Sequence, residues 1–344
     1  MRINCIIPVY NVERFLPQCI DSVLNQSYKD FKIILINDCS PDGSLDICRK
    51  YEAEHPDKIV LIDKPVNEGV DKARFTGLDY VLTNSDLCGG ILFLDSDDYL
   101  SQDAFRQLHQ EMVSTGADVV EMRTQRVLGP IKRPVFSPVP AQVISRPRLM
   151  DDFYISFFGI NLLTPGVTGR LYKTELLKSA ALSPSEFKMG EDLMFIMRLF
   201  PCIEKLAIID YPGYNYRIGG LTSRYNPTFW DDLKCQYAIK RAELVRHNYD
   251  KGFRPLAIEL INIFYTSLQQ RIYYLNETKE RTCTWIKSEL VDKELWKDVA
   301  DYSLSEGKDI VHGDVEAIYA EACTRLRAGW KRRLIKKILT LFLK

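Results

Sequence analysis

The chain has 344 residues, of which 46% are hydrophobic and 27% are charged. This composition is typical of a folded globular protein and excludes wholesale disorder or a disulfide-stapled miniprotein. Lys+Arg and Asp+Glu both total 46, so the net charge is zero and no overall field attracts nucleic acid. No stretch reaches the roughly 18 uninterrupted apolar residues of a membrane span, and the N-terminus lacks the pattern of a signal peptide. We therefore expect a cytoplasmic protein without a nucleic-acid partner.

The cysteines and histidines give no sign of a bridge framework or a zinc centre. The nine cysteines are scattered and form no Cys-x-x-Cys pair, and the four histidines are isolated from one another. An odd, scattered set of cysteines is typical of reduced thiols. Without clustered Cys or His ligands, a zinc hydrolase site is not expected.

Residues 1–122 alternate between short β-branched runs and segments of helical period. Asn11 precedes the first helical segment and is its predicted N-cap. The alternation predicts a Rossmann-like α/β fold, in which a mainly parallel sheet is flanked by helices and binds ligands at the carboxyl ends of its strands. The expected strands are 3–9, 32–37, 59–62, 90–94 and 117–122, and the expected helices are 15–24, 45–51, 73–82 and 102–115.

The pattern changes in the second part of the chain. Residues 123–150 alternate Pro with Arg and Lys, which predicts a surface excursion rather than a continuous element. A helix is expected over 193–200 and a strand over 205–209, followed by an aromatic turn at 211–216. From 227 to 320 the sequence predicts a C-terminal helical region.

Two features of the C-terminal part each have two interpretations. The aromatic residues Trp230, Tyr265, Tyr273 and Tyr274 are predicted to form either core or an acceptor platform. The tail 321–344 combines basic and apolar residues at helical spacing. It is predicted either to lie on an anionic membrane surface as an amphipathic helix or to dock on the helical region of the protein itself.

Polar residues follow four of the expected strands, and the fourth strand leads directly into acid. Asp95, Asp97 and Asp98 lie within four residues. Their carboxylates repel one another unless a cation neutralises them, and hard oxygen ligands suit Mn²⁺ or Mg²⁺. This Asp-x-Asp (DXD) motif therefore predicts a divalent metal site. An acidic turn that only caps the next helix is the alternative for an isolated motif.

Three other interpretations of this acidic segment fail on the sequence. A calcium loop of the EF-hand type requires Gly and Glu where the chain has Leu100 and Arg106. A haloacid-type phosphatase motif does not accommodate Tyr99 and normally ends the first strand. A dinucleotide fold requires a Gly-x-Gly-x-x-Gly turn after the first strand, which is absent here.

Five segments together resemble a family 2 glycosyltransferase of the GT-A fold, the inverting type that builds bacterial surface glycans. They are residues 6–11, 36–44, 67–74, 93–98 and 190–192. The resemblance covers the first 225 residues. It implies three parts: a catalytic domain that binds a nucleotide sugar (1–225), a helical region (226–320) and the basic amphipathic tail (321–344).

The resemblance also implies roles for individual residues. Asp38 would hydrogen-bond the base, Asp97 and Asp98 would hold Mn²⁺ or Mg²⁺, and Asp192 would be the catalytic base. Favourable charge at a helix N-terminus is the alternative for Asp192. The role of Arg170, where many members have Lys, stays open. The donor pocket would be formed by Pro8, Val9, Tyr10, Asp38, Asn67, Arg74, Asp95, Ser96 and Asp97.

The segment 214–224 resembles the region that closes over donor and acceptor in these enzymes, with Arg217 or Arg224 reaching phosphate; a surface turn is the alternative. The resemblance implies a metal-dependent, inverting hexosyl- or N-acetylhexosaminyl-transferase. It would move a sugar from a UDP-linked donor to a hydroxyl of a surface glycan or lipid-linked acceptor, at the inner face of the membrane if the tail binds there. Two alternatives remain: a nucleotidyltransferase, whose usual Gly-rich basic loop is missing after the first strand, and a non-catalytic membrane-associated scaffold with the same fold.

Overall fold

The computed structural model describes residues 1–218, 226–306 and 314–327. The chain divides into two compact units. The described residues of the first unit are 1–154, 162–186 and 191–218, and those of the second are 155–161, 187–190, 226–306 and 314–327.

The first unit is built on one ten-stranded sheet with the order β3-β2-β1-β4-β9-β6-β10-β5, in which β7 pairs with β6 and β8 with β10. The first four strands of this order are parallel, and β9 is antiparallel to both of its neighbours. The predicted α/β class is confirmed. The strands are β1 Arg2–Val9, β2 Phe31–Asn37, β3 Ile59–Asp63, β4 Gly89–Phe93, β5 Tyr99–Leu100, β6 Val119–Leu128, β7 Ile131–Pro134, β8 Gln142–Ser145, β9 Arg170–Lys173 and β10 Lys205–Arg217.

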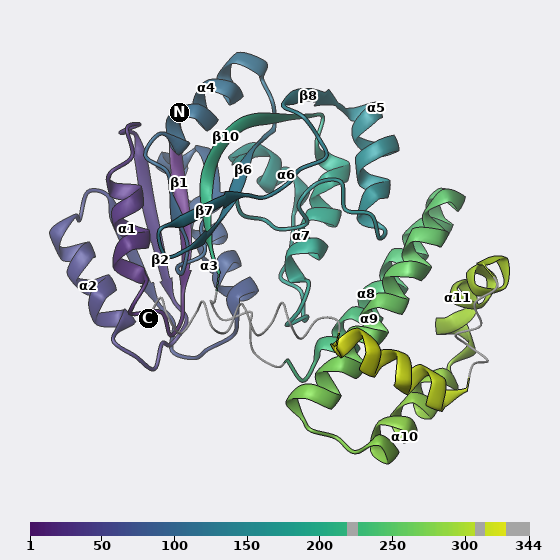
Figure 1. Cartoon of the computed structure of the whole chain (residues 1–344). Helices are drawn as coiled ribbons and strands as arrows, with labels where there is room; N and C mark the ends of the chain where they lie inside the picture. Colours follow the sequence, from purple (N-terminus) through teal and green to yellow (C-terminus); the bar gives the residue numbers. More distant parts are fainter. Residues whose placement is uncertain (219–225, 307–313, 328–344) are drawn as a thin grey trace. The chain divides into compact units, whose positions relative to one another are not determined.

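Helices cover the sheet on both faces, as Figure 1 shows for the first unit. Apolar residues of α1, α2 and α4 join alternate residues of β1 in one core cluster. On the other face α3 approaches closely, because a Cβ added at Gly77 would lie 2.6 Å from Ile6 Cγ2 and 3.0 Å from Ile36 Cδ1. The helices of this unit are α1 Leu16–Leu24, α2 Ser44–Glu54, α3 Val70–Thr83, α4 Ala104–Thr115, α5 Arg146–Arg148, α6 Thr174–Ala180 and α7 Glu191–Leu199.

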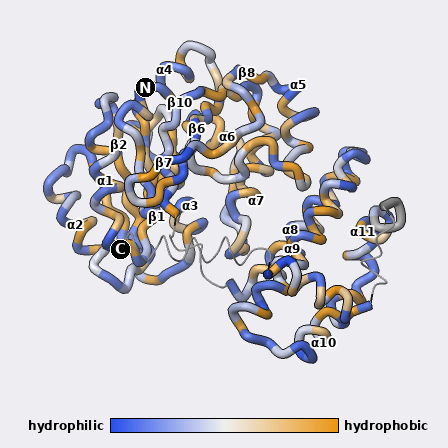
Figure 2. Tube along the Cα trace, viewed as in Figure 1, coloured by the Kyte–Doolittle hydropathy of each residue, from blue (hydrophilic) through white to orange (hydrophobic). Residues whose placement is uncertain are grey.

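Burial on both faces explains the sequence of the central strands. Residues 3–9 of β1 and 33–37 of β2 are all buried, so both faces of these strands select apolar residues. The tube in Figure 2 is accordingly mostly hydrophobic along these strands and alternates between hydrophobic and hydrophilic along the helices. The sheet therefore forms a rigid layer that presents its strand ends.

Three local predictions are wrong. Asn11 is not a helix cap: it has a φ of 54°, and α1 begins only at Leu16, where the Val12 carbonyl accepts from the Phe15 and Leu16 amides. The segment 123–150 is not only a surface excursion, because β6 extends into it, forms a hairpin with β7, and β8 pairs with β10. The aromatic segment 211–216 is not a turn, because β10 continues through it with register shifts around Pro212.

The described residues of the second unit are mainly helical, which confirms the predicted C-terminal helical region. Trp230, Phe264, Trp285 and Trp296 form an aromatic cluster with ring centroids 5.0–6.3 Å apart. Trp230 is therefore core. None of the helices in the described part of the chain is long and apolar enough to cross a bilayer. The labelled long helices are α8 Phe229–His247, α9 Phe253–Tyr274, α10 Lys279–Leu290 and α11 Lys293–Glu306, and residues 315–327 are helical as well.

The other three aromatic residues named from the sequence of this unit differ in burial. Tyr265 is buried, whereas Tyr273 and Tyr274 are about half exposed near the end of α9. Residues 328–344, which hold most of the predicted amphipathic tail, lie outside the described residues, as does Arg224.

Candidate functional site

The candidate site lies in the first unit, where β1, β2, β3 and β4 end. The ends of β1 and β2 are joined by the Asp38 amide, which donates to the Val9 carbonyl at 2.9 Å. Parallel strands bring their carboxyl ends to the same edge, so segments far apart in the sequence meet here. The edge therefore gathers the polar residues that the sequence places after each strand.

Asp38 is buried and organises the loop after β3. One carboxylate oxygen accepts from Lys64 Nζ at 2.8 Å and from the Glu68 amide at 3.1 Å, and the other accepts from the Gly69 amide at 2.8 Å. Burial lowers the pKa of Lys64, but Asp38 and Glu68 outweigh it, and the pKa is raised overall. Asp38 thus shapes the loop that carries Asn67.

Asp98 is buried beneath the edge and held by β10. Its two carboxylate oxygens accept from the Tyr214 hydroxyl and from the Arg217 amide, each at 2.7 Å. Burial, followed by the negative charges of Asp95 and Asp97, raises the pKa of Asp98 to about 8. These contacts favour a positioning role for Asp98, although the prediction that it binds metal stays a prediction.

Asp97 is the half-buried carboxylate of the same turn. Within the part of the chain that the structure describes, no other residue donates a hydrogen bond to its side chain. Burial and the neighbouring Asp95 raise its pKa to about 6. Its carbonyl accepts from Arg217 Nε at 2.7 Å, and the Arg217 guanidinium also contacts the faces of the Phe15 and Tyr99 rings. The backbone of Asp97 is therefore held in place, while its carboxylate remains available to bind a ligand.

Arg74 connects the two acidic segments of the site. Its guanidinium, 7% exposed, donates to Asp192 Oδ1 at 2.5 Å and to Asp95 Oδ1 at 2.7 Å, and it lies 3.9 Å from Glu191 Oε1. Burial opposes the charge of Arg74, but the carboxylates raise its pKa overall. The DXD turn and the start of α7 therefore meet through one buried cation.

The two acids at the start of α7 are both difficult to ionise. Burial and then the charge of Asp192 raise the pKa of Glu191 to about 7, against the opposite effect of Arg74. Burial also raises the pKa of Asp192, although Arg74 and the Val167 amide stabilise its charge. Groups whose pKa is shifted by burial beside specific charges are candidates for functional sites.

The remaining predicted residues lie around this cluster. Pro8 and Val9 are buried at the end of β1, and Tyr10, which follows them, is exposed. Asn67 is exposed, and its side chain accepts from the Gly69 amide at 3.1 Å. Ser96 is buried. The structure thus joins Arg74, Asp95 and Asp192 directly, whereas no hydrogen bond among the described residues links Tyr10 or Ser96 to them through a side chain.

Two residues of the site, Lys64 and Tyr214, have contacts that the sequence does not predict. Lys64 directly follows the third strand, so its position at the carboxyl edge could have been recognised. Tyr214 reaches Asp98 from 116 residues away, and no local pattern signals that contact. Arg217 contacts the Asp97 carbonyl and Gln18 Oε1, and the prediction that Arg217 or Arg224 reaches phosphate stays a prediction.

No group of three or more His, Cys, Asp or Glu side chains in the described ranges is arranged to hold a metal ion by itself. Asp97 nevertheless fits one ligand position, because its carboxylate is available and burial penalises its charge. Mg²⁺ is commonly bound by one or two carboxylates together with substrate phosphates. The edge is therefore suited to a metal that arrives with a phosphorylated ligand.

Fold and site define the chain as an α/β protein with a candidate ligand site at the carboxyl ends of parallel strands, the arrangement of many nucleotide-binding enzymes. The sequence model described as "Glycosyl transferase family 2" matches residues 5–178, and the chain belongs to this family. The resemblance recognised in the sequence is confirmed.

Similar proteins agree with this assignment. The chain is 30% identical over 245 residues to "Uncharacterized glycosyltransferase EpsJ" of Bacillus subtilis (strain 168), covering 70% of this chain and 69% of that protein. It is 29% identical over 229 residues to "Glycosyltransferase GlyA" of Streptococcus pneumoniae serotype 4, covering 63% of this chain but only 30% of that protein. The chain thus corresponds to less than a third of GlyA.

The crystal structure of S. aureus TarS 1–349 in complex with UDP-GlcNAc has a TM-score of 0.66 to this structure at 19% identity. The match covers 96% of this chain and 92% of that one. At this identity the likeness concerns the fold, and the predicted GT-A fold with a C-terminal helical region is confirmed.

Proposed function

We propose that the chain is a metal-dependent inverting glycosyltransferase that uses a UDP-linked sugar. The observation that carries the proposal is the contact of Arg74 with both Asp95 and Asp192, because it brings the DXD turn and the candidate base into one site. The catalytic domain would be residues 1–225, with 226–320 a helical region and 321–344 the tail.

The donor would lie along the carboxyl edge of the sheet. Pro8, Val9 and Tyr10 would line the nucleotide pocket, and Asp38 would shape the adjoining loop through its bonds to Lys64 and to the Glu68 and Gly69 amides. Asp95, Ser96 and Arg74 would face the ribose or the sugar. Asn67 is exposed on the same loop and would contact the donor at the rim of the nucleotide pocket.

Mn²⁺ or Mg²⁺ would be held by Asp97, whose carboxylate accepts no hydrogen bond from another described residue. When bound, the metal would stabilise the negative charge that develops on the diphosphate leaving group. Asp98 would hold the DXD turn in place through Tyr214 and Arg217 rather than act mainly as a ligand.

Asp192 would act as the base. In an inverting displacement the acceptor oxygen bonds to the anomeric carbon, the bond from that carbon to the diphosphate breaks, and the electron pair leaves with the diphosphate. The hydroxyl proton must pass to a group on the acceptor side. Asp192 Oδ1 is bound to Arg74, so Oδ2 is the oxygen that would take this proton.

The names of relatives support a surface polymer as acceptor. TarS of Staphylococcus aureus, 24% identical over 220 residues and matched over 35% of its length, is named a poly(ribitol-phosphate) beta-N-acetylglucosaminyltransferase. By analogy we propose a hydroxyl of a surface glycan or lipid-linked carrier as the acceptor of this chain, and a hexose or N-acetylhexosamine as the transferred sugar. Contact of the tail with an anionic membrane would bring the enzyme to such an acceptor.

Donor hydrolysis with a panel of UDP-, GDP- and dTDP-sugars, with and without Mn²⁺, tests the proposal. We expect release of UDP and free sugar that depends on Mn²⁺. Release of pyrophosphate from a nucleoside triphosphate and a sugar phosphate would instead identify a nucleotidyltransferase. Absence of turnover with every donor, in the presence of extracts that supply acceptors, would identify a non-catalytic scaffold.

A further inference from the structure

Arg170, whose role the sequence leaves open, is a buried clamp for the loop of residues 164–167. Its side chain is 3% exposed. Nε donates to Glu121 Oε2 at 2.7 Å, while the two terminal nitrogens donate to the Gly166 carbonyl at 2.5 Å and the Thr164 carbonyl at 2.6 Å. Reaching one carboxylate and two carbonyls at once requires the planar fork of Arg, which the single ammonium of Lys cannot reproduce.

Tyr172 holds the same loop from the next position on that face of β9. Residues two apart on a strand point to the same side, and the buried Tyr172 hydroxyl donates to the Val167 carbonyl at 2.9 Å. The loop 164–167 therefore has three of its carbonyls tied to two side chains of β9. Such a network restricts the loop to one conformation.

The other side of this loop faces Asp192. The Val167 backbone stabilises the charged form of Asp192, because it lowers the pKa of that carboxyl against the effect of burial. Gly166 lies in front of the same group, since a Cβ added there would be 3.5 Å from Asp192 Oδ2. Arg74 holds Oδ1 of this carboxylate, and Oδ2 faces the side-chain-free surface of Gly166.

We infer that Arg170 and Tyr172 are positioning residues that hold the 164–167 loop so that it aims Asp192 Oδ2 at the acceptor. This inference rests on the proposed function, because it assigns a direction to the proposed base. Neither residue touches the donor edge through a contact that the structure records. Their effect would therefore fall on the chemical step rather than on nucleotide affinity.

The test compares two Tyr→Phe variants that each delete one buried hydrogen bond. Tyr172→Phe removes the donor to Val167. Tyr237→Phe, the matched control, removes the donor to Asp298 Oδ2 at 2.8 Å in the second unit. For each variant we would measure kcat for UDP release from the preferred donor, UDP affinity by calorimetry, and the melting temperature, with kinetics recorded well below the lower Tm.

We expect both variants to melt at similar, slightly reduced temperatures, whereas only Tyr172→Phe lowers kcat, by about tenfold, with unchanged UDP affinity. If the Arg170→Lys variant folds, its kcat should be lower still, with unchanged UDP affinity. If that variant does not fold, the result for Tyr172→Phe alone tests the positioning role. Normal kcat in Tyr172→Phe, or an equal loss in both tyrosine variants, would overturn the positioning role alone. A wild type inactive with every donor would overturn the proposed function and this inference together.

Discussion

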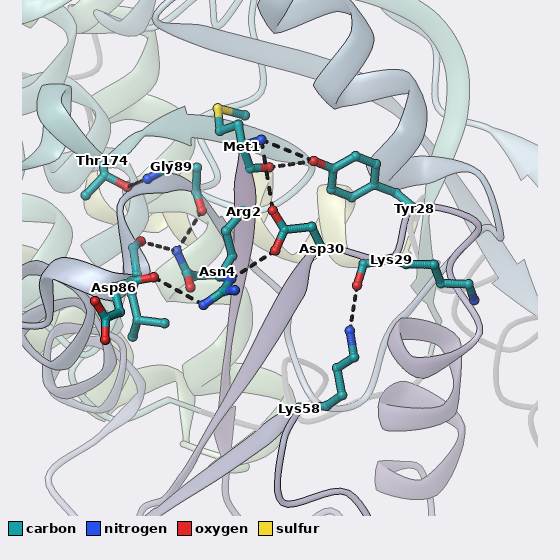
Figure 3. A network of polar contacts seen from close by, with 12 residues as sticks. Met1, Arg2, Asn4, Tyr28, Lys29, Asp30, Lys58, Asp86, Gly89 and Thr174 are labelled. Atoms are coloured by element: carbon teal, nitrogen blue, oxygen red, sulfur yellow. Dashed lines mark hydrogen bonds and ion pairs between the residues drawn. The ribbon is translucent and has the colours of Figure 1, made fainter.

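The amino-terminal and carboxyl-terminal edges of the sheet in the first unit differ in how their polar groups are paired. At the amino-terminal edge, shown in Figure 3, Asn4 donates to the Leu87 and Gly90 carbonyls, and Arg2 pairs with Asp30 at 3.0 Å and donates to the Asp86 carbonyl. Groups of opposite polarity meet there, and backbone carbonyls take up the remaining donors.

At the carboxyl-terminal edge, several carboxylates gather with Arg74 between them. Asp95, Asp97 and Asp98 follow β4, and Glu191 and Asp192 approach them through Arg74. Burial raises the pKa values of four of these five acids. The carboxyl-terminal edge therefore carries several acids that are costly to ionise, and a bound cation would lower that cost. Substitutions should therefore separate the two: changes at one edge should affect function, and changes at the other should affect stability.

The largest effect is expected for Asp192→Asn. It preserves the shape of the side chain but removes its basicity, so kcat should fall by roughly 10²–10⁴-fold while donor affinity barely changes. Steady-state kinetics with the preferred donor, combined with calorimetry of UDP binding, would measure both. Near-normal turnover would move the role of base to Glu191, whose carboxylate lies 3.9 Å from the same arginine.

Asp38→Ala should weaken UDP binding about tenfold, with or without Mn²⁺. The loss of its carboxylate removes partners from Lys64 Nζ and from the Glu68 and Gly69 amides, so the loop beside the nucleotide would lose its fixed shape. Calorimetry in the presence and absence of metal measures this directly. Unchanged affinity in both conditions would remove Asp38 from the donor site.

Asn4→Ala should lower stability and leave UDP binding unchanged. It deletes the two buried hydrogen bonds to Leu87 and Gly90, at distances of 2.7 and 3.2 Å, on the edge away from the site. We expect a loss of about 1–3 kcal/mol in the free energy of unfolding and unchanged kcat and UDP affinity. Urea denaturation would measure the free energy of unfolding, and kinetics on the same preparation would measure kcat. A loss of kcat without a loss of stability would contradict the expectation that the amino-terminal edge affects stability and not function.

The smallest effect concerns Glu191→Gln and depends on pH. The folded-state pKa of Glu191 is raised to about 7, so ionising it costs stability progressively as the pH rises from the unfolded-state value through 7. Gln cannot ionise, and the variant should therefore melt about 1–3 °C above the wild type at pH 8, with the difference shrinking toward pH 5. Equal melting temperatures at both values would show that this charge is already compensated in the wild type.

The sequence predicts the fold well where burial on both faces selects apolar strands, as in residues 3–9 and 32–37. It also predicts which residues gather at the carboxyl edge, because parallel strands place their ends together. It fails where long-range contacts decide the conformation. The extended β10 is stabilised by pairing with β6 and β8, and the contacts of Asp98 with Tyr214 and Arg217 join residues more than a hundred positions apart.

Binding of UDP to wild type and Asp97→Ala, titrated by calorimetry with and without Mn²⁺, tests the central claim most directly, and Asn4→Ala serves as the folded control. The claim is that the excess carboxylate at the carboxyl edge is held for a metal that arrives with the nucleotide. It predicts that Mn²⁺ strengthens UDP binding to the wild type and to Asn4→Ala, and that Asp97→Ala loses this gain while it remains folded. Full retention of the Mn²⁺ effect in Asp97→Ala would contradict the assignment of this edge as the donor site.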